Sequence, residues 1–169
     1  MSALVIATER LTLRRQRVED FEPFARALGS DRSKYMGGPI SRDTAWTWFC
    51  SDEAAWAFQG HGGMTVTLTA TGEVLGQVAV LQPPRFAERE IGWLAYPAAE
   101  GKGYMAEAAR ALRDWAFAEA GFDTLVSYID PANDRSRLLA ERIGGRADTE
   151  AARPDPEDLV YRHRPEWAL

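Results

Sequence analysis

A glycine-containing turn between a strand and a long amphipathic helix constrains this sequence more than any other feature. The turn is Glu100-Gly101-Lys102-Gly103-Tyr104-Met105, and the residues before it, 90–96, read as a strand. A turn that joins a strand directly to a helix presents the unpaired N–H groups of the helix and the positive end of its dipole. Glycine also lets a ligand approach the backbone where a Cβ would block it. We therefore expect this turn to hold a pyrophosphate.

The glycine spacing alone does not identify a ligand. With 14 glycines in 169 residues, chance gives roughly one Gly-x-Gly, and Gly60-His61-Gly62 is a second example that we interpret as a plain loop. A Rossmann pattern is absent because Ala106 stands three residues after Gly103. A nucleotide P-loop is absent because Lys102 is not followed by Ser or Thr. An ordinary strand-to-helix connection is therefore the alternative interpretation.

Hydrophobic periodicity predicts one mixed α/β domain spanning residues 1–169. Residues 74–82 are apolar on both faces, which is typical of a central strand covered by helices. Ser41 and Asn133 are expected helix N-caps. Strands are expected at residues 10–15, 64–69, 74–82, 90–96, 124–129, 146–150 and 159–163, and helices at 19–28, 41–58, 104–120 and 133–143.

Charge and cysteine content narrow the classes of function. The formal net charge of −5 argues against a non-specific nucleic-acid binder and is compatible with an amine substrate. The single cysteine, Cys50, gives no disulfide framework and favours a reducing compartment. The apolar run at residues 3–7 is too short for a secretory signal and is not preceded by basic residues. No apolar run approaches membrane-spanning length. We therefore expect a cytoplasmic protein that binds neither nucleic acid nor membrane.

Three motifs follow one another along nearly the whole chain. The first is Thr8-Glu9-Arg10-Leu11-Thr12-Leu13-Arg14, the second combines Glu90-Ile91-Gly92-Trp93 with Gly101-Lys102-Gly103-Tyr104-Met105-Ala106-Glu107-Ala108, and the third combines Asn133-Asp134-Arg135-Ser136 with Glu141-Arg142-Ile143-Gly144. Together they resemble the GNAT superfamily of acyl-CoA-dependent N-acetyltransferases, and most closely the branch that includes the ribosomal-protein N-terminal acetyltransferases RimJ and RimL. The resemblance implies the GNAT fold, a mostly antiparallel twisted sheet of about seven strands, splayed between strands 4 and 5 and flanked by about four helices.

The resemblance also implies a site for acetyl-CoA. The pyrophosphate would rest on backbone amides of the turn, from Gly101, Lys102 and Gly103 to Tyr104 and Met105. The pantetheine arm would pair like an extra strand along Trp93, Leu94 and Ala95. A backbone N–H near Leu94 would polarise the thioester carbonyl, and a donor so placed is typically worth ~3–4 kcal/mol in the transition state. Asn133 would either cap its helix alone or also contact the pantetheine arm.

The catalytic residues are harder to assign from sequence. Glu90 is the first choice for the base, close to where some relatives place a catalytic glutamate, and Glu88 ranks lower. A free glutamate is a feeble base for a protonated amine, so Glu90 needs a raised pKa or a relaying water. The alternative is a salt-bridged surface carboxylate beside Arg89. Many relatives carry a tyrosine acid where this chain has Ala140.

The general acid is therefore not assigned to one residue, and several hydroxyl groups are candidates for it. Ser136 is possible because relatives in this branch keep a hydroxyl there near the sulfur, although a first-turn serine that only caps its helix explains it equally. The phenols of Tyr104 and Tyr128 lie near the expected site, and packing is the more ordinary role for each. Cys50 has no base nearby that would make it a nucleophile. Two isolated histidines, His61 and His163, do not make a metal site.

Two functions follow from these features. The leading one is an enzyme that transfers the acetyl group of acetyl-CoA to a primary amine by direct attack in a ternary complex. The acceptor could be a protein N-terminus, an amino sugar, a polyamine or an antibiotic, and the enzyme could be a monomer or a homodimer. The alternative is a non-catalytic module that binds or senses acyl-CoA, which the alanine at position 140 favours.

Overall fold

The computed structural model describes residues 4–168, so the outermost parts of the expected domain, residues 1–3 and 169, lie outside the described chain. Within residues 4–168, eight strands form one sheet in the order β1-β2-β3-β4-β5-β6-β8-β7. The strands are β1 (Val5–Ala7), β2 (Leu11–Arg15), β3 (Gly63–Leu68), β4 (Val74–Leu81), β5 (Glu90–Ala95), β6 (Leu125–Ile129), β7 (Arg146–Ala147) and β8 (Leu159–His163). The α-helices are α1 (Phe21–Leu28), α2 (Arg42–Gln59), α3 (Tyr104–Ala118) and α4 (Asp134–Arg142).

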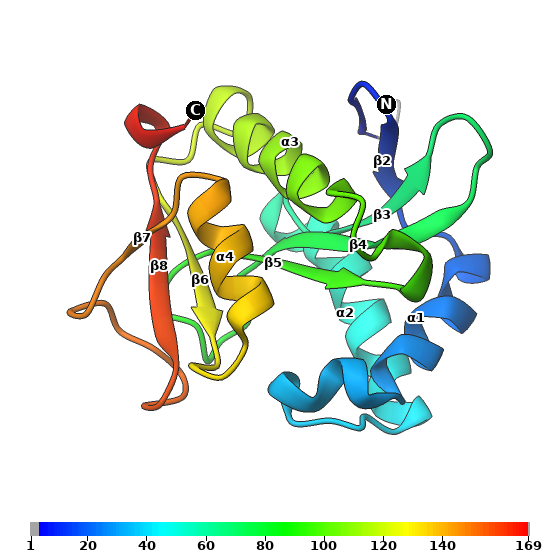
Figure 1. The fold of residues 1–169 in the computed structure, drawn as a ribbon, viewed down its shortest axis with the longest axis horizontal. Coiled ribbons are helices and arrows are strands. Elements are labelled where there is room, and N and C mark those ends of the chain that lie inside the picture. The colour runs from blue at the N-terminus through cyan, green and yellow to red at the C-terminus, as the bar shows by residue number, and fades with distance from the viewer. Residues whose placement is uncertain (1–3, 169) are drawn as a thin grey trace.

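The predicted fold class, a mixed α/β fold with a mostly antiparallel sheet, is confirmed. Every neighbouring pair of strands is antiparallel except β5 and β6, which are parallel. In Figure 1, β4 and β5 run across the middle of the view, whereas β6 and β8 stand nearly upright to their left. The sheet therefore changes direction at the step from β5 to β6.

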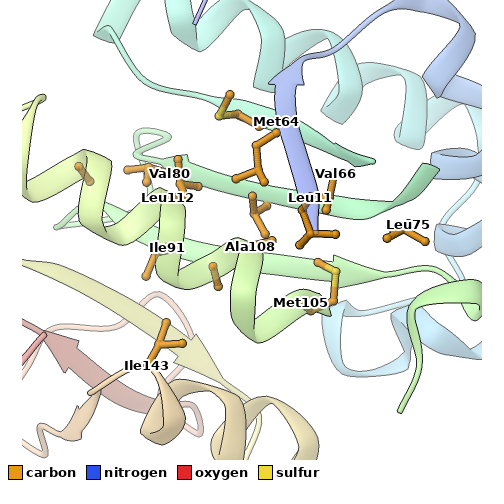
Figure 2. Close-up of a cluster of buried hydrophobic side chains, with 14 of the residues drawn as sticks. Leu11, Met64, Val66, Leu75, Val80, Ile91, Met105, Ala108, Leu112 and Ile143 are labelled. Carbon is orange, nitrogen blue, oxygen red and sulfur yellow. The ribbon is translucent and has the colours of Figure 1, made fainter. Parts of the chain in front are cut away.

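One face of the sheet packs against α3. Its core contains Leu11 and Leu13 of β2, which are fully buried as the alternation of that strand predicted. Figure 2 shows Leu11 in the cluster of buried side chains that includes Met105, Ala108 and Leu112 of α3. Helix α3 is thus held by its apolar side, and its first turn is fixed in position at the end of β5.

The opposite face of the sheet is covered by α1 and α2. Phe21, Phe24 and Phe49 form a second core there, together with Leu94 of β5 and Tyr96 just after it. Ser41 caps α2 as predicted, its hydroxyl accepting the N–H of Thr44 at 3.1 Å. The side chains of β5 therefore alternate between two environments, α3 on one face and the α1–α2 pair on the other.

Several boundaries differ from the sequence-based expectation. Strand β1 was not predicted as a strand, because three residues are too few for a periodic signal, yet it pairs with β2. The expected strand 146–150 ends at Ala147, because the Asp148 carboxylate accepts the N–H groups of Glu150 and Ala151 and turns the chain. A 3-10 helix, η2 (Asp31–Met36), fills a stretch that had no prediction. Another, η1 (Val18–Asp20), takes up the start of the expected first helix.

Candidate active site

The sheet opens between β5 and β6, at the strands where the splay was expected. Glu90 and Val126 form the one paired position between these strands, supported by the Val126 N–H bond to the carbonyl of Arg89 at 3.0 Å. One residue further, the Ser127 hydroxyl rather than a backbone amide reaches the Ile91 carbonyl, at 2.8 Å. Ser127 Oγ lies 3.1 Å from Nε2 of the buried His163. This side-chain bridge closes the narrow end of the opening.

Beyond that point, the edge of β5 that faces β6 has backbone groups without strand partners. Neighbouring residues of a strand direct their N–H and C=O groups to opposite sides. The Arg89 carbonyl bonds toward β6 and the Tyr96 N–H bonds toward Leu75 of β4. Odd-numbered residues therefore face the opening, so Trp93 and Ala95 present their backbone there, whereas the backbone of Leu94 is directed to β4. The donor expected near Leu94 is then an amide of one of its neighbours.

The glycine turn has the geometry of an open anion site. Gly101 and Gly103 have φ of 71° and 74°, and Gly103 immediately precedes α3, whose first N–H groups have no side-chain cap. Gly101, Lys102 and Gly103 are exposed, and Tyr104 is partly buried. The Met105 side chain is buried in the core, so only its backbone can serve a ligand. The turn therefore offers uncapped amides at a helix start, which fits the diphosphate of coenzyme A.

Arg10 of the β1–β2 connection fixes the position of this turn. Its guanidinium donates to the Lys102 carbonyl at 3.0 Å, packs 4.6 Å from the centre of the Tyr104 ring, and pairs with Glu107 at 2.7 Å. A shallow hollow of about 330 Å³ lies beside Gly103 and is lined partly by arginines. A second hollow, of about 290 Å³, lies along β7 and β8 and does not include the turn. Because Glu9 and Glu107 line this hollow together with the arginines, its lining is of mixed charge and does not by itself indicate an anion site.

Glu100 links three segments at the wide end of the opening. Its carboxylate lies 3.0 Å from Arg32 of η2 and 2.8 Å from Arg135 at the start of α4. Hydrogen bonds from Arg32 and then Arg135 lower the pKa of Glu100. Arg32 also donates to the Ala95 carbonyl at 3.2 Å, one of the β5 groups that face the opening. Arg32 therefore connects Glu100 to the edge of β5, and Arg135 lies beside Glu100.

The start of α4 brings Asn133 and Ser136 to the same opening. Asn133 caps α4, its side-chain oxygen accepting the Ser136 N–H at 3.2 Å. The Ser136 hydroxyl accepts the indole N–H of Trp93 at 3.2 Å. Ala140 is fully buried beside Ile129 and Tyr161, so no phenol extends from its position on α4. The structure therefore joins Trp93 and Ser136 across the opening.

Glu90 lies on the face of β5 covered by α1 and α2. Its carboxylate lies 3.8 Å from where a Cβ on Gly92 would be, so it lies over the next residue on its face of the strand. Burial raises the pKa of Glu90 to about 7, although the Tyr128 backbone and Arg85 act in the opposite direction. No ion pair with Arg89 forms, and Arg89 instead packs 4.2 Å from the Phe122 ring centre. Glu90 therefore has the raised pKa that a general base for an amine requires.

Tyr128 on β6 faces the same side as Glu90. Val126 pairs with Glu90, and residues two apart on a strand share a face. Burial raises the pKa of the Tyr128 phenol, and the charges of Glu88 and Glu90 raise it further. Its hydroxyl oxygen is buried and has no hydrogen-bond partner among residues 4–168. Tyr104, the other phenol considered, instead packs against the guanidinium of Arg10.

The structure adds polar residues that sequence reasoning missed. Asp52 of α2 is 8% exposed and accepts one hydrogen bond, from the Gln77 amide at 2.8 Å. Burial raises the pKa of Asp52 to about 7. One sequence signal could have found it, because Ala45, Phe49, Asp52 and Trp56 follow one helical stripe with a single acid in it.

Residues 4–168 contain no helix that is long and apolar enough to cross a membrane. The same residues contain no cluster of three or more histidine, cysteine, aspartate or glutamate side chains that could hold a metal ion. Cys50 is exposed. His61 is buried and bonds to the Val80 carbonyl at 2.7 Å.

Comparison with known proteins identifies the family. A family model described as an acetyltransferase (GNAT) domain matches residues 10–146. The chain belongs to the GNAT acetyltransferase family. It is similar to a crystal structure of an acetyltransferase from Agrobacterium tumefaciens strain C58, with 49% identity over 97% of this chain and 96% of that one, and a TM-score of 0.93.

The other relatives do not assign the chain to a particular branch of the family. Protein YkkB of Bacillus subtilis strain 168 is 41% identical over 76 residues, which are 44% of this chain and 44% of YkkB, so the match spans less than half of that relative. RimL, the ribosomal L7/L12 alpha-N-protein acetyltransferase, is 13% identical over 97% of this chain and 96% of its own, with a TM-score of 0.75. At that identity the likeness to RimL shows the fold alone. The predicted superfamily is thus confirmed, and the RimJ and RimL branch has only loose support.

Proposed function

We propose that this protein transfers the acetyl group of acetyl-CoA to a primary amine. The observation that carries the proposal is the juxtaposition of three features around one opening in the sheet. These are uncapped amides at residues 101–105, unpaired β5 backbone at Trp93 and Ala95, and a glutamate with a pKa of about 7 at the narrow end. Each corresponds to one requirement of acyl transfer: an anchored nucleotide, an aligned thioester and a base.

The residues would act as follows. The amides of the turn hold the diphosphate, and Arg32 and Arg135 supply positive charge beside it. The N–H of Trp93 or Ala95 stabilises the negative charge that develops on the thioester oxygen. Glu90 accepts a proton from the amine as the C–N bond forms and the C–S bond breaks. The departing thiolate gains a proton, for which the Ser136 hydroxyl is the candidate donor.

The test is a screen of amine acceptors with purified protein and acetyl-CoA, read by release of free thiol and by mass detection of the acetylated product. We expect N-acetyl products from at least one class of primary amine, and loss of product when Glu90 is replaced by Gln. Tight binding of coenzyme A without thiol release across proteins, amino sugars, polyamines and aminoglycosides would instead support the acyl-CoA-binding module.

A further inference from the structure

At Ile91, a side chain takes the place of the next backbone hydrogen bond between β5 and β6. In a parallel pair of strands, alternate N–H groups of one strand bond to alternate carbonyls of the other. The Val126 N–H bonds to the Arg89 carbonyl at 3.0 Å. A regular ladder would continue with a bond from the Tyr128 N–H to the Ile91 carbonyl. The pairing instead stops at Val126, and the Ser127 hydroxyl donates to the Ile91 carbonyl at 2.8 Å.

His163 fixes the direction of the Ser127 hydroxyl. A carbonyl oxygen only accepts, so the single hydroxyl hydrogen of Ser127 is donated to Ile91. The Ser127 oxygen therefore accepts the Nε2–H of His163, 3.1 Å away. His163 Nδ1 is buried and has no hydrogen-bond partner among residues 4–168, which suits the bare nitrogen of a neutral imidazole. Burial lowers the pKa of His163 to about 4, with Arg113 acting in the same direction, so this donor keeps one form near neutral pH.

The Tyr128 N–H that the ladder leaves free acts on the Glu90 carboxylate. Burial raises the pKa of Glu90, and a hydrogen bond from the Tyr128 backbone acts in the opposite direction. The carboxylate lies over Gly92, which has no side chain in its way. Charged side chains on other segments also act on this pKa, namely Arg85, which lowers it, and Asp158 and Asp52, which raise it. None of these three belongs to β6, so only the Tyr128 contribution depends on how far β5 and β6 pair.

We propose that Ser127 is a positioning residue that acts through Glu90. Its hydroxyl occupies the Ile91 carbonyl and so leaves the Tyr128 N–H free to bond to the carboxylate of the base. This inference rests on the proposed function, in which Glu90 accepts the proton of the amine. Without the hydroxyl, the Tyr128 N–H would pair with the Ile91 carbonyl, because a buried carbonyl without a donor is costly. The ladder would then extend by one bond, the opening would be shorter, and Glu90 would lose a donor.

The experiment compares Ser127→Thr with Ser127→Val, because the two new side chains have nearly the same shape and differ in the hydroxyl group. Ser127→Thr should keep the pH dependence of the wild type. In Ser127→Val, loss of one N–H donor should raise the pKa of Glu90 by about one unit. The ratio of kcat/KM for Ser127→Val to that for Ser127→Thr cancels the titration of the amine acceptor. This ratio should be roughly tenfold lower at about pH 6 than at about pH 9.

Thr67→Val is the matched control. Thr67 is a buried residue of β3 whose hydroxyl donates to the Thr12 carbonyl of β2 at 3.0 Å, and β4 lies between β3 and β5. This variant removes the same kind of bond between neighbouring strands and should keep the pH dependence of the wild type. In the Glu90→Gln background, Ser127→Val and Ser127→Thr should have the same pH dependence, because the group through which Ser127 acts is gone.

Urea unfolding gives a readout independent of turnover. A carboxyl whose pKa is raised by folding loses its contribution to stability as the pH rises through the folded pKa. Ser127→Val should therefore lose stability relative to Ser127→Thr as the pH rises from about 7 to about 8. A stability difference and a kcat/KM ratio that do not change with pH would overturn the role of Ser127 while leaving acetyl transfer intact. Absence of turnover with every amine would instead contradict the proposed function, and unfolding would still test the link between Ser127 and Glu90.

Discussion

Replacing Glu90 by Gln should lower activity and raise stability at the same time. Burial raises the pKa of this carboxyl from 4.5 to about 7. A carboxyl whose pKa is raised by folding stabilises the fold while it is protonated, and that contribution is lost as the pH rises from the unfolded value through the folded one. The full shift corresponds to roughly 3 kcal/mol, and because the side chain is partly exposed we expect about 1–3 kcal/mol.

The stability difference between Glu90→Gln and the wild type should therefore be small near pH 4.5, grow with pH, and level off above about pH 7. Urea unfolding at a series of pH values measures it. Asp52 contributes a trend of the same sign, so the variant must be compared with the wild type at each pH rather than read alone. A constant difference across this range would refute the raised pKa of Glu90.

Activity should change in the opposite direction. A positioned general base is typically worth 10²–10⁴-fold, so we expect about that loss in kcat/KM for Glu90→Gln above pH 7. Taking the ratio of wild type to variant cancels the titration of the amine acceptor. Below about pH 7 this ratio should fall roughly tenfold per pH unit, because the wild-type base becomes protonated. The dissociation constant of acetyl-CoA should be the same for Glu90→Gln and the wild type. Unchanged turnover in Glu90→Gln would remove this residue from the mechanism.

Three further predictions concern the turn and the sheet. Gly103→Ala should cost about 1–2 kcal/mol of stability because of its φ of 74°, and it should weaken coenzyme A binding measured by calorimetry. The control Gly72→Ala, with φ of 76° in the β3–β4 turn, should have the same stability cost without affecting binding. Glu100→Gln should tighten coenzyme A binding by no more than about fivefold, because it frees Arg32 and Arg135 from a surface ion pair. The control Glu119→Gln, at the exposed end of α3, should leave coenzyme A binding unchanged. Burial lowers the pKa of His163 to about 4, with Arg113 acting in the same direction, so the contribution of His163 to the free energy of unfolding should fall by about 3 kcal/mol as the pH drops from 6.5 to 4. Comparing the wild type with His163→Gln at each pH isolates this contribution from those of the carboxyl groups.

The main elements could be predicted from sequence because their signals are local. The alternation of Leu11 and Leu13, the hydroxyl of Ser41 before a helical stripe, and the glycines around residue 102 each act within a few residues. The backbone at Gly101 and Gly103 has the positive φ that glycine tolerates best. The glycine turn could therefore be predicted, and no side chain caps the amides that follow it, while its binding of a pyrophosphate stays a prediction.

The polar contacts of the site could not be predicted in the same way, because they join distant segments. The Ser127 bridge to Ile91 and His163 depends on three strands meeting, and Ser127 alone is an ordinary strand residue. Which residue near Leu94 would donate to the thioester oxygen depends on which β5 residues direct their N–H groups to the opening. The periodicity of side chains in the sequence does not show this. The open acceptor on Gln16 follows from its packing against Gly63, a contact 47 positions along the chain.

A third acid on this face shows how the fold neutralises a carboxylate that serves structure alone. Asp20 is buried as deeply as Asp52, yet Arg14 contacts both of its oxygens at 2.7 and 2.9 Å, and Thr65 and the Arg17 N–H add further bonds. Burial alone would raise the pKa of Asp20, but these bonds outweigh it and the pKa is lowered. Asp52 and Glu90 lie on the same face without an arginine, and their pKa values are raised instead. The fold thus neutralises Asp20 with an arginine, whereas Asp52 and Glu90 can be neutralised by a proton near pH 7, and under the proposed function the amine acceptor supplies that proton to Glu90.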